Sequence, residues 1–257
     1  MAKIITVANN KGGVGKSMLT YHYAKRFSRI GNTMVIDLDS QGNVTKYLMR
    51  GEPLPDHAHV QNFFTNKKRN VSYIVDKADD TELQLFGSSI SLSESENSGD
   101  LNKYFTLRKA LKKINTDNIK YIIIDTPPNI GLFTLNALLV SDYVVLPVDS
   151  SMDSFEALDI MYRTIDDVRN DHNERLQIAG IVPNGFDMRT KADQQQIKRI
   201  SESYGPDLIK TIIPHSTTMR TARAEYKTIG ELDQFNPVAE AIEDSYHDLL
   251  IRTTRGL

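Results

Sequence analysis

The chain has no cysteine among its 257 residues. This absence excludes disulfides, thiolate metal sites and iron–sulfur clusters, and it is typical of a cytoplasmic protein. No uncharged apolar run approaches the ~20 residues that a membrane-spanning helix needs. The first residues lack the basic segment and apolar core of a signal peptide. The formal net charge is only −2, so a surface for nucleic acid would have to be local. We therefore expect a cytoplasmic protein with no membrane partner.

Short apolar runs recur along the chain and predict buried β-strands. They lie at residues 4–7, 34–36, 121–124, 143–148 and 178–182. Each run is continuous rather than alternating in polarity, which is typical of strands covered on both faces of a parallel sheet. Helical patterns lie between the runs. This alternation favours an α/β fold with a doubly wound, mostly parallel sheet flanked by helices, and we expect one domain over residues 1–257.

Two helices are predicted from apolar residues that recur at helical spacing. The first face consists of Leu19, Tyr23, Phe27 and Ile30, with Gly31 as the expected stop. The second, near the end of the chain, consists of Val238, Ile242, Tyr246 and Leu249, and we expect it to dock on the core. Residues 51–59 and the serine-rich residues 88–99 are predicted to be loops.

The segment ANNKGGVGKSML begins at Ala8, directly after the first predicted strand. Its three glycines allow the backbone to bend so that successive N–H groups point at an anion. A helix that begins near Lys16 adds its N-terminal dipole. Lys16 is expected to reach the β- and γ-phosphates of a nucleotide, and the Ser17 hydroxyl to ligate Mg²⁺. A glycine-rich turn with a chance lysine is the alternative, which the order strand, loop, G-K-S and helix disfavours.

The segment KGGVGKS resembles the deviant Walker A motif of the ParA/MinD-type P-loop ATPases. Asn10 then stands where the ordinary motif has glycine, and Met18 stands where the family usually has a second hydroxyl residue. The resemblance implies a P-loop NTPase fold and ATP with Mg²⁺ as ligands. It implies that Lys11 reaches the partner's phosphates in an ATP sandwich dimer, so that hydrolysis depends on pairing. The residues implied to bind ATP here are Lys11, Gly12, Gly13, Val14, Gly15, Lys16, Ser17 and Met18.

Acidic residues follow two of the predicted strands. In VIDLDSQGN, Asp37 and Asp39 occupy positions i and i+2, so both point the same way, toward the crevice at the carboxyl end of the sheet. This segment resembles the family's A′ motif, with Ser40 in place of proline. The resemblance implies that Asp39 orients or polarises the attacking water and that Asp37 supports the Mg²⁺ shell. Asp125 ends the run YIIID as in a Walker B motif and is expected to hold Mg²⁺ through water. The implied catalytic residues are thus Lys11, Lys16 and Asp39.

Two further sites are implied for the last third of the chain. Asn184 and Pro214 would flank the adenine, since an asparagine amide both donates and accepts; a plain turn after Pro183 is the alternative for Asn184. Residues 189–227 hold eight Lys or Arg against four Asp or Glu. The resemblance to the ParA branch implies non-specific, salt-dependent binding of double-stranded DNA there, through Arg189, Arg220 and Arg223. A solvated helix face is the alternative.

The resemblance covers nearly the whole chain and is weakest over residues 51–99. The lack of cysteine excludes the iron–sulfur members, and we expect no N-terminal helix-turn-helix domain before the glycine loop. We predict a nucleoid-associated DNA partition ATPase. Its ATP-bound homodimer would bind DNA, and a ParB-type centromere-binding protein would stimulate hydrolysis, which positions plasmid or chromosome copies. A MinD-like membrane-surface or cargo-positioning ATPase is the alternative, although the acidic start of the C-terminal segment disfavours it. An amide-forming P-loop ligase is a third.

Overall fold

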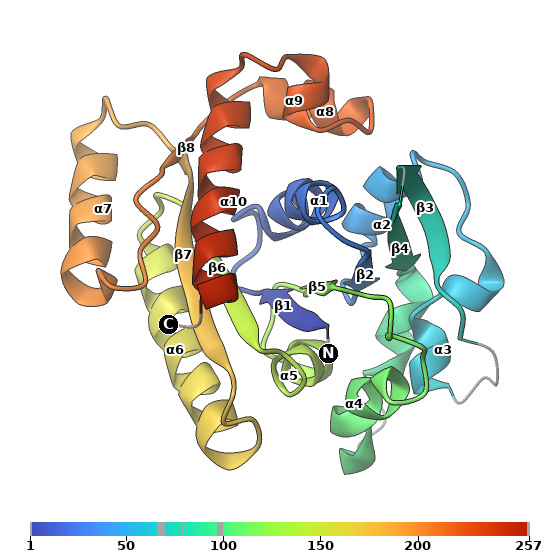
Figure 1. The fold of residues 1–257 in the computed structure, drawn as a ribbon. Helices are drawn as coiled ribbons and strands as arrows, with labels where there is room; N and C mark the ends of the chain where they lie inside the picture. Colours follow the sequence, from blue (N-terminus) through green and yellow to red (C-terminus); the bar gives the residue numbers. More distant parts are fainter. Residues whose placement is uncertain (1, 66–69, 79, 97–99, 256–257) are drawn as a thin grey trace.

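The computed structural model describes residues 2–65, 70–78, 80–96 and 100–255. An eight-stranded sheet crosses the molecule in the order β3-β4-β2-β5-β1-β6-β7-β8 (Figure 1). Neighbouring strands are parallel except for the antiparallel pair β3–β4, so the predicted fold class is confirmed. The strands are β1 Lys3–Val7, β2 Thr33–Asp37, β3 Tyr73–Ala78, β4 Thr81–Phe86, β5 Tyr121–Asp125, β6 Tyr143–Val148, β7 Gln177–Phe186 and β8 Ile213–Pro214.

Helices cover both faces of this sheet, with α1 and α10 on one face and α4, α5 and α6 on the other (Figure 1). The helices are α1 Lys16–Phe27, α2 Asn43–Leu48, α3 Gln61–Phe64, α4 Thr106–Leu111, α5 Leu132–Leu138, α6 Asp153–Asp171, α7 Lys191–Tyr204, α8 Thr218–Ala224, α9 Ile229–Leu232 and α10 Pro237–Arg255. Single 3₁₀ segments lie at Asp56–Ala58, Ile90–Ser95 and Leu101–Phe105. No helix of the described residues is both long and apolar enough to cross a membrane.

Strand β5 shows why the apolar runs are continuous. All five of its residues are buried. Ile123 packs into the core under α1 and α10, whereas Ile122 and Ile124 pack into the core formed with α4 and α5. Because successive side chains point to opposite faces, both faces need apolar residues, and the period-two pattern of a half-exposed strand disappears.

The two helices predicted from apolar spacing differ in outcome. In α10 the four residues of the predicted stripe are at most 4% exposed and lie in the core beside α1, as expected. The stripe of α1 was extended too far, because the helix ends at Phe27 and Ile30 is 40% exposed. The helix ends in a tighter turn with 3₁₀-type hydrogen bonds. The N–H groups of Arg29 and Ile30 donate to the carbonyl oxygens three residues back, those of Arg26 and Phe27, and the chain then leaves the helix.

The expectation of plain loops over residues 51–59 and 88–99 was only partly right. Residues 56–58 and 90–95 form 3₁₀ turns, and Leu92, which is part of the second turn, is fully buried. Residues 97–99 lie outside the described residues. Between these segments, β3 and β4 form a hairpin that the sequence analysis missed. The alternation of half-buried polar and buried apolar residues in TELQLF, Thr81–Phe86, is the signal that could have identified β4.

The strand order creates a binding crevice at one edge of the sheet, where the carboxyl ends of the parallel strands lie. Strand β1 lies between β5 and β6, and the chain leaves β1 toward β2 but leaves β5 toward β6. This is a topological switch point, at which the loops after the carboxyl ends of parallel strands open a crevice. The loops that follow β1, β2, β5 and β6 lie at this edge. The predicted phosphate-binding and magnesium-binding residues lie in the loop and helix start after β1 and at the ends of β2 and β5.

Candidate nucleotide-binding site

The loop between β1 and α1 has the geometry of an anion-binding turn. Gly13 and Gly15 have φ angles of 83° and 95°, a region that favours glycine. Gly15 is the N-cap of α1, and the first turn of that helix has no acidic side chain to neutralise its positive end. The backbone N–H groups at this helix start are therefore available to a phosphate.

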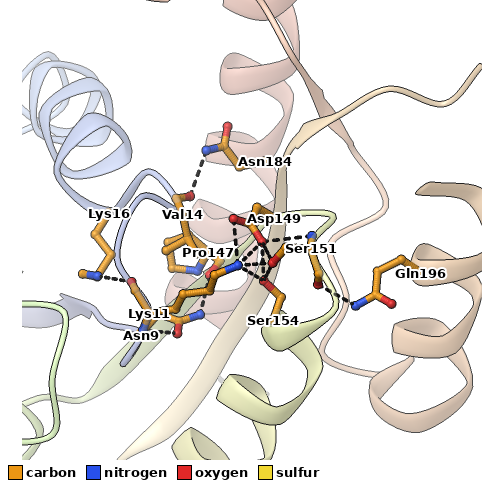
Figure 2. Close-up of polar contacts among 10 residues, drawn as sticks. All are labelled: Asn9, Lys11, Val14, Lys16, Pro147, Asp149, Ser151, Ser154, Asn184 and Gln196. Carbon is orange, nitrogen blue, oxygen red and sulfur yellow. Dashed lines mark hydrogen bonds and ion pairs between the residues drawn. The ribbon is translucent and has the colours of Figure 1, made fainter. Parts of the chain in front are cut away.

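Lys16 stands at the start of α1 with its ammonium inside the loop. The residue is 7% exposed, and Nζ donates a hydrogen bond of 2.7 Å to the carbonyl oxygen of Lys11 (Figure 2). Burial lowers the pKa of Lys16, while the nearby Asp125 and Asp39 raise it. Within the described residues Lys16 has no ion pair. A buried ammonium whose acceptor is a neutral carbonyl suits an incoming phosphate, which would replace that carbonyl.

Ser17 and Asp125 come together as the sequence predicted. The Ser17 hydroxyl donates to Asp125 Oδ2 at 2.7 Å, and Thr20, one turn further along α1, donates to Oδ1 at 2.9 Å. Asp125 is fully buried and lies opposite Asp37 in the β2–β5 register. Burial raises the pKa of Asp125 well above its usual value, and the neighbouring Asp37 raises it further.

The balance of charge in this cluster fits a divalent cation. Three carboxylates, those of Asp37, Asp39 and Asp125, are at most 7% exposed, and Lys16 is the cation that the pKa shifts place beside them. Among the described residues no three His, Cys, Asp or Glu side chains are grouped as a closed metal site. An ion such as Mg²⁺ would therefore be held by Ser17 and Asp125 together with phosphate oxygens and water, which is how Mg²⁺ is usually bound.

Asp37 and Asp39 point into the same loop but have different partners. Asp37 is fully buried; its Oδ1 accepts from the N–H of Asp39 at 3.1 Å, and its Oδ2 accepts from the N–H and the hydroxyl of Thr45 at 2.9 and 2.7 Å. Burial raises the pKa of Asp37 to about 6, against the effect of the Thr45 bonds. Among the described residues, the Asp39 side chain accepts only from the N–H of Gln41, at Oδ1 and 2.9 Å. Its Oδ2 is thus the carboxylate oxygen of this cluster that can take a water molecule without giving up a hydrogen bond to the described residues.

The additional lysine of the loop, Lys11, points away from the phosphate-binding turn. Lys11 Nζ contacts both carboxylate oxygens of Asp149 just after β6, at 2.9 and 3.1 Å, and it also donates to the hydroxyls of Ser151 and Ser154 at the start of α6. In Figure 2 its side chain extends to the α6 side of the loop, away from the Lys16 ammonium. The Lys11 and Asp149 side chains are 21% and 30% exposed, so the pair lies close to solvent.

Asn184 and Pro214 are brought close together by two paired strands, and Asn184 also contacts the phosphate loop. They lie on the paired strands β7 and β8, where Asn184 stands opposite Ile213, next to Pro214. The amide Nδ2 of Asn184 donates to the Val14 carbonyl at 2.9 Å (Figure 2), and it contacts the position that a Cβ on Gly15 would take. Asn184 therefore packs against the back of the phosphate loop; its contact with adenine stays a prediction.

Four residues at the site were missed by the sequence analysis: Asn9, Thr20, Thr45 and Asp149. Asn9 links the loop to β6, since its Nδ2 donates to the Pro147 carbonyl at 2.7 Å and its Oδ1 accepts from the Lys11 N–H at 3.0 Å. Asp149 had a signal of the same kind as Asp125, because it directly follows an apolar strand. Thr20 is one helical turn after Ser17, a spacing that places both hydroxyls on one helix face.

The three arginines predicted to bind DNA lie on two segments. Arg189 is 90% exposed, but its guanidinium already forms a bidentate pair with Asp187, at 2.8 and 2.7 Å. This pair lowers the pKa of Asp187 to about 2. Arg220 and Arg223 lie on α8 and are exposed, and neither has an ion pair within the described residues. Their charge is therefore uncompensated, unlike that of Arg189.

Helix α10 bears on the membrane-surface alternative. Its apolar stripe packs on α1 and the sheet rather than facing outward, whereas an interfacial helix must expose its apolar face to lipid. The apolar face of α10 is thus used for packing within the described part of the chain, which disfavours the membrane-surface alternative.

Comparison with known proteins places the chain among nucleotide-binding relatives. The sequence matches the family described as "AAA domain" over residues 2–178. It is 31% identical over 247 residues to the sporulation initiation inhibitor protein Soj of Bacillus subtilis, which covers 95% of this chain and 96% of that protein. It is 28% identical over 260 residues to the chromosome-partitioning ATPase Soj of Thermus thermophilus, which covers 96% of this chain and 95% of that protein.

A solved structure shares the fold at lower identity. Cobyrinic acid a,c-diamide synthase from Mycobacterium smegmatis, with bound ATP analogue and magnesium, superposes with a TM-score of 0.79 at 23% identity. The match covers 100% of this chain and 97% of that one. This likeness concerns the fold alone, which a synthase and a partition ATPase therefore share. The sequence relatives, matched over nearly their whole length, favour the partition ATPases.

Proposed function

The chain belongs to the AAA-domain family and, with its Soj relatives, to the ParA-type partition ATPases, and on this premise we propose that it hydrolyses ATP to segregate DNA. The observation that carries the proposal is the pair of lysines in the loop. Lys16 occupies the loop's own phosphate cradle, whereas Lys11 extends to the α6 side of the loop (Figure 2). Lys16 alone would serve the nucleotide bound in the chain's own loop. We therefore assign Lys11 to the nucleotide bound by a second copy of the chain.

ATP and Mg²⁺ are the proposed ligands. The backbone from Gly12 to Met18 would bind the phosphates, and Lys16 would turn from the Lys11 carbonyl to the β- and γ-phosphates. Ser17 and Asp125 would hold the cation. When bound, Mg²⁺ neutralises the charge that develops on the transferred phosphoryl group. The solved synthase with bound ATP analogue and magnesium supports this choice of ligands.

Hydrolysis would need two copies of the chain. Lys11 would leave Asp149 and reach the γ-phosphate in the partner, where an ammonium stabilises the transition state. Asp39, whose carboxylate has unused lone pairs, would orient the attacking water. Because the second ammonium comes from the partner, turnover would begin only after ATP has paired two copies.

The ATP-bound dimer would bind double-stranded DNA without sequence preference through α8. Arg220 and Arg223 supply uncompensated positive charge there, and such contacts release counterions from the phosphate backbone. A ParB-type centromere-binding protein would stimulate hydrolysis and release. The outcome would be the positioning of plasmid or chromosome copies on the nucleoid in the cytoplasm.

Sedimentation velocity with and without ATP and duplex DNA tests this function. We expect a monomer without nucleotide, a dimer with ATP and magnesium, and co-sedimentation with random-sequence DNA only in the second case. Binding of the ATP form to anionic vesicles but not to DNA would instead support the MinD-like alternative. Formation of an amide product, with no ATP-dependent dimer, would support the synthase alternative.

A further inference from the structure

The loop that carries Asp39 is held by a residue on α2. Thr45 is 7% exposed, and it gives two hydrogen bonds to the same oxygen, Oδ2 of Asp37. The other oxygen of Asp37 accepts the N–H of Asp39. Asp37 is fully buried, and both of its carboxylate oxygens accept hydrogen bonds from the protein. Two of these donors are backbone N–H groups, and the third is the Thr45 side chain.

The Thr45 hydroxyl has a fixed direction. It accepts a hydrogen bond of 2.8 Å from the backbone N–H of Ser88, just after β4. A backbone N–H only donates, so the single proton of the hydroxyl must go to Asp37 Oδ2, 2.7 Å away. The hydroxyl thus joins the end of β4 to the end of β2, two neighbouring strands of the sheet (Figure 1).

The backbone just after β4 leaves room for this side chain. A Cβ on Gly87 would lie 2.7 Å from Leu54 Cδ2, 2.8 Å from Thr45 Cγ2 and 2.9 Å from Thr45 Oγ1, distances that real Cβ atoms do not tolerate. Gly42, just before α2, has a φ of 60°, and a Cβ there would lie 3.1 Å from the Ser88 carbonyl oxygen. Two glycines therefore let the loop from Asp37 to Thr45 approach β4 closely.

We propose that Thr45 is a positioning residue for ATP hydrolysis, whose hydroxyl ties Asp37 to the end of β4 and thereby fixes the place of Asp39. This rests on the proposed function, in which Asp39 orients the attacking water. The tie acts through the hydrogen bond from the Asp39 N–H to Asp37 Oδ1. Displacing a water-orienting group by about 1 Å lowers the rate on the order of 100-fold. Loss of the bond from Thr45 should therefore lower the turnover rate while ATP binding is little changed.

Steady-state ATPase assays of Thr45→Val and Thr45→Ser, with random-sequence duplex DNA present, test the proposal. Valine keeps both γ-branches but removes the hydroxyl; serine keeps the hydroxyl. We expect Thr45→Val to lower kcat by about 10- to 100-fold with KM for ATP within about 2-fold of wild type, and Thr45→Ser to restore most of kcat. A merely structural threonine would instead change thermal stability without this split between kcat and KM.

Ser88→Ala is the matched control. It removes a buried hydroxyl next to the same contact, but this hydroxyl has no hydrogen-bond partner among the described residues, and the N–H that Thr45 needs remains. We expect wild-type kcat in this variant. Wild-type kcat in Thr45→Val, or equal losses in Thr45→Val and Ser88→Ala, would overturn the proposal.

Gly87→Ala approaches the same contact from the residue just after β4 and decides the matter if Thr45→Val does not fold. Its Cβ would collide with Thr45 and with the Cδ2 end of Leu54. We expect a loss of kcat at nearly unchanged KM, and wild-type kcat would overturn the proposal. Wild-type turnover is measured first. A wild-type protein without ATPase activity would overturn the proposed function and this role together, whereas an active wild type with an unaffected Thr45→Val would overturn only the role of Thr45.

Discussion

The ammonium of Lys11 lies 2.9 Å from one carboxylate oxygen of Asp149 and 3.1 Å from the other, within a single chain. A lysine proposed to act on a partner's phosphates is thus paired internally before any partner is present. Both side chains are partly exposed, so the pair contributes on the order of 1 kcal/mol or less. That is small beside the interactions of a nucleotide-bound dimer, and the pair can open when ATP is bound.

We expect Asp149→Asn to favour the ATP-bound dimer, because Lys11 then leaves a weaker partner. The dimer dissociation constant with ATP should fall about 2- to 5-fold, measured by sedimentation. Asp153→Asn is the control, since it removes the same charge from an exposed residue nearby that has no hydrogen bond to Lys11. An unchanged dissociation constant in Asp149→Asn would mean that the pair does not restrain Lys11.

The two loop lysines should differ when each is replaced by alanine. Lys11→Ala should bind a fluorescent ATP analogue as wild type does, because Lys16 remains in the cradle, but turnover should fall by at least about 100-fold. Lys16→Ala should lose nucleotide binding itself. Phosphate release and equilibrium titration separate the two effects, and a fully active Lys11→Ala would refute catalysis across a dimer interface.

Asp39→Ala should trap the ATP-bound dimer. The side chain that would orient water is lost, while the phosphate loop, Ser17 and Asp125 are untouched. We expect a stable dimer with ATP and a turnover about 100-fold or more below wild type. Chromatography of the variant with bound nucleotide checks this, and wild-type turnover would contradict the assignment of Asp39.

Removal of the buried charge of Asp125 should stabilise the nucleotide-free protein at pH 8. A carboxyl whose folded-state pKa is raised holds its proton more tightly in the folded state, so its favourable contribution is present at low pH and is lost as the pH rises through that pKa. Asp125→Asn should therefore raise the free energy of unfolding at pH 8 with a chelator present, as measured by denaturant unfolding. The gain should shrink at pH 5, while the stabilisation by magnesium and ATP should disappear.

Asp37→Asn is the informative comparison for Asp125→Asn. The partners of Asp125 are hydroxyls, which can rotate to accept from an amide. Two of the three donors to Asp37 are backbone N–H groups, which cannot accept. The amide of Asp37→Asn therefore leaves a donor facing a donor, and no stabilisation is expected even though the pKa of Asp37 is raised to about 6. Equal stabilisation by both variants would contradict this account.

DNA binding should depend on α8 more than on the β7–α7 loop. Arg220→Ala and Arg223→Ala should each lower the salt dependence of binding by about one unit in the log–log slope. Arg189→Ala should have a smaller effect, because its guanidinium is paired with Asp187. Arg175→Ala is the control, since Arg175 precedes β7 and so lies at the opposite edge of the sheet. Filter binding over a series of salt concentrations checks the order, and an equal effect of Arg175→Ala would argue against a surface at α8.

Local order in the sequence was sufficient for the fold and for the identity of the phosphate loop. Continuous apolar runs such as Tyr121–Asp125 indicate doubly covered strands wherever they occur, and a glycine loop between a strand and a helix start needs only its own backbone to form an anion site. Ser17 and Asp125 could be assigned to one predicted magnesium site because the loop after β1 and the end of β5 lie at the same edge of the sheet.

Only the tertiary structure decided which partner each polar group of the site has. Three such results are that Lys11 bonds to Asp149, that Thr45 joins Asp37 to Ser88, and that Arg189 is paired whereas Arg220 has no ion pair among the described residues. They depend on contacts between segments far apart in the chain or on side-chain rotamers. The alternation in TELQLF indicates a strand, but the place of β4 beside β2 is fixed by its neighbours in the sheet. The close approach of Thr45 to Gly87 exists only once β4 lies beside β2. The sequence determined which groups are available, and the packing of the sheet determined which of them meet.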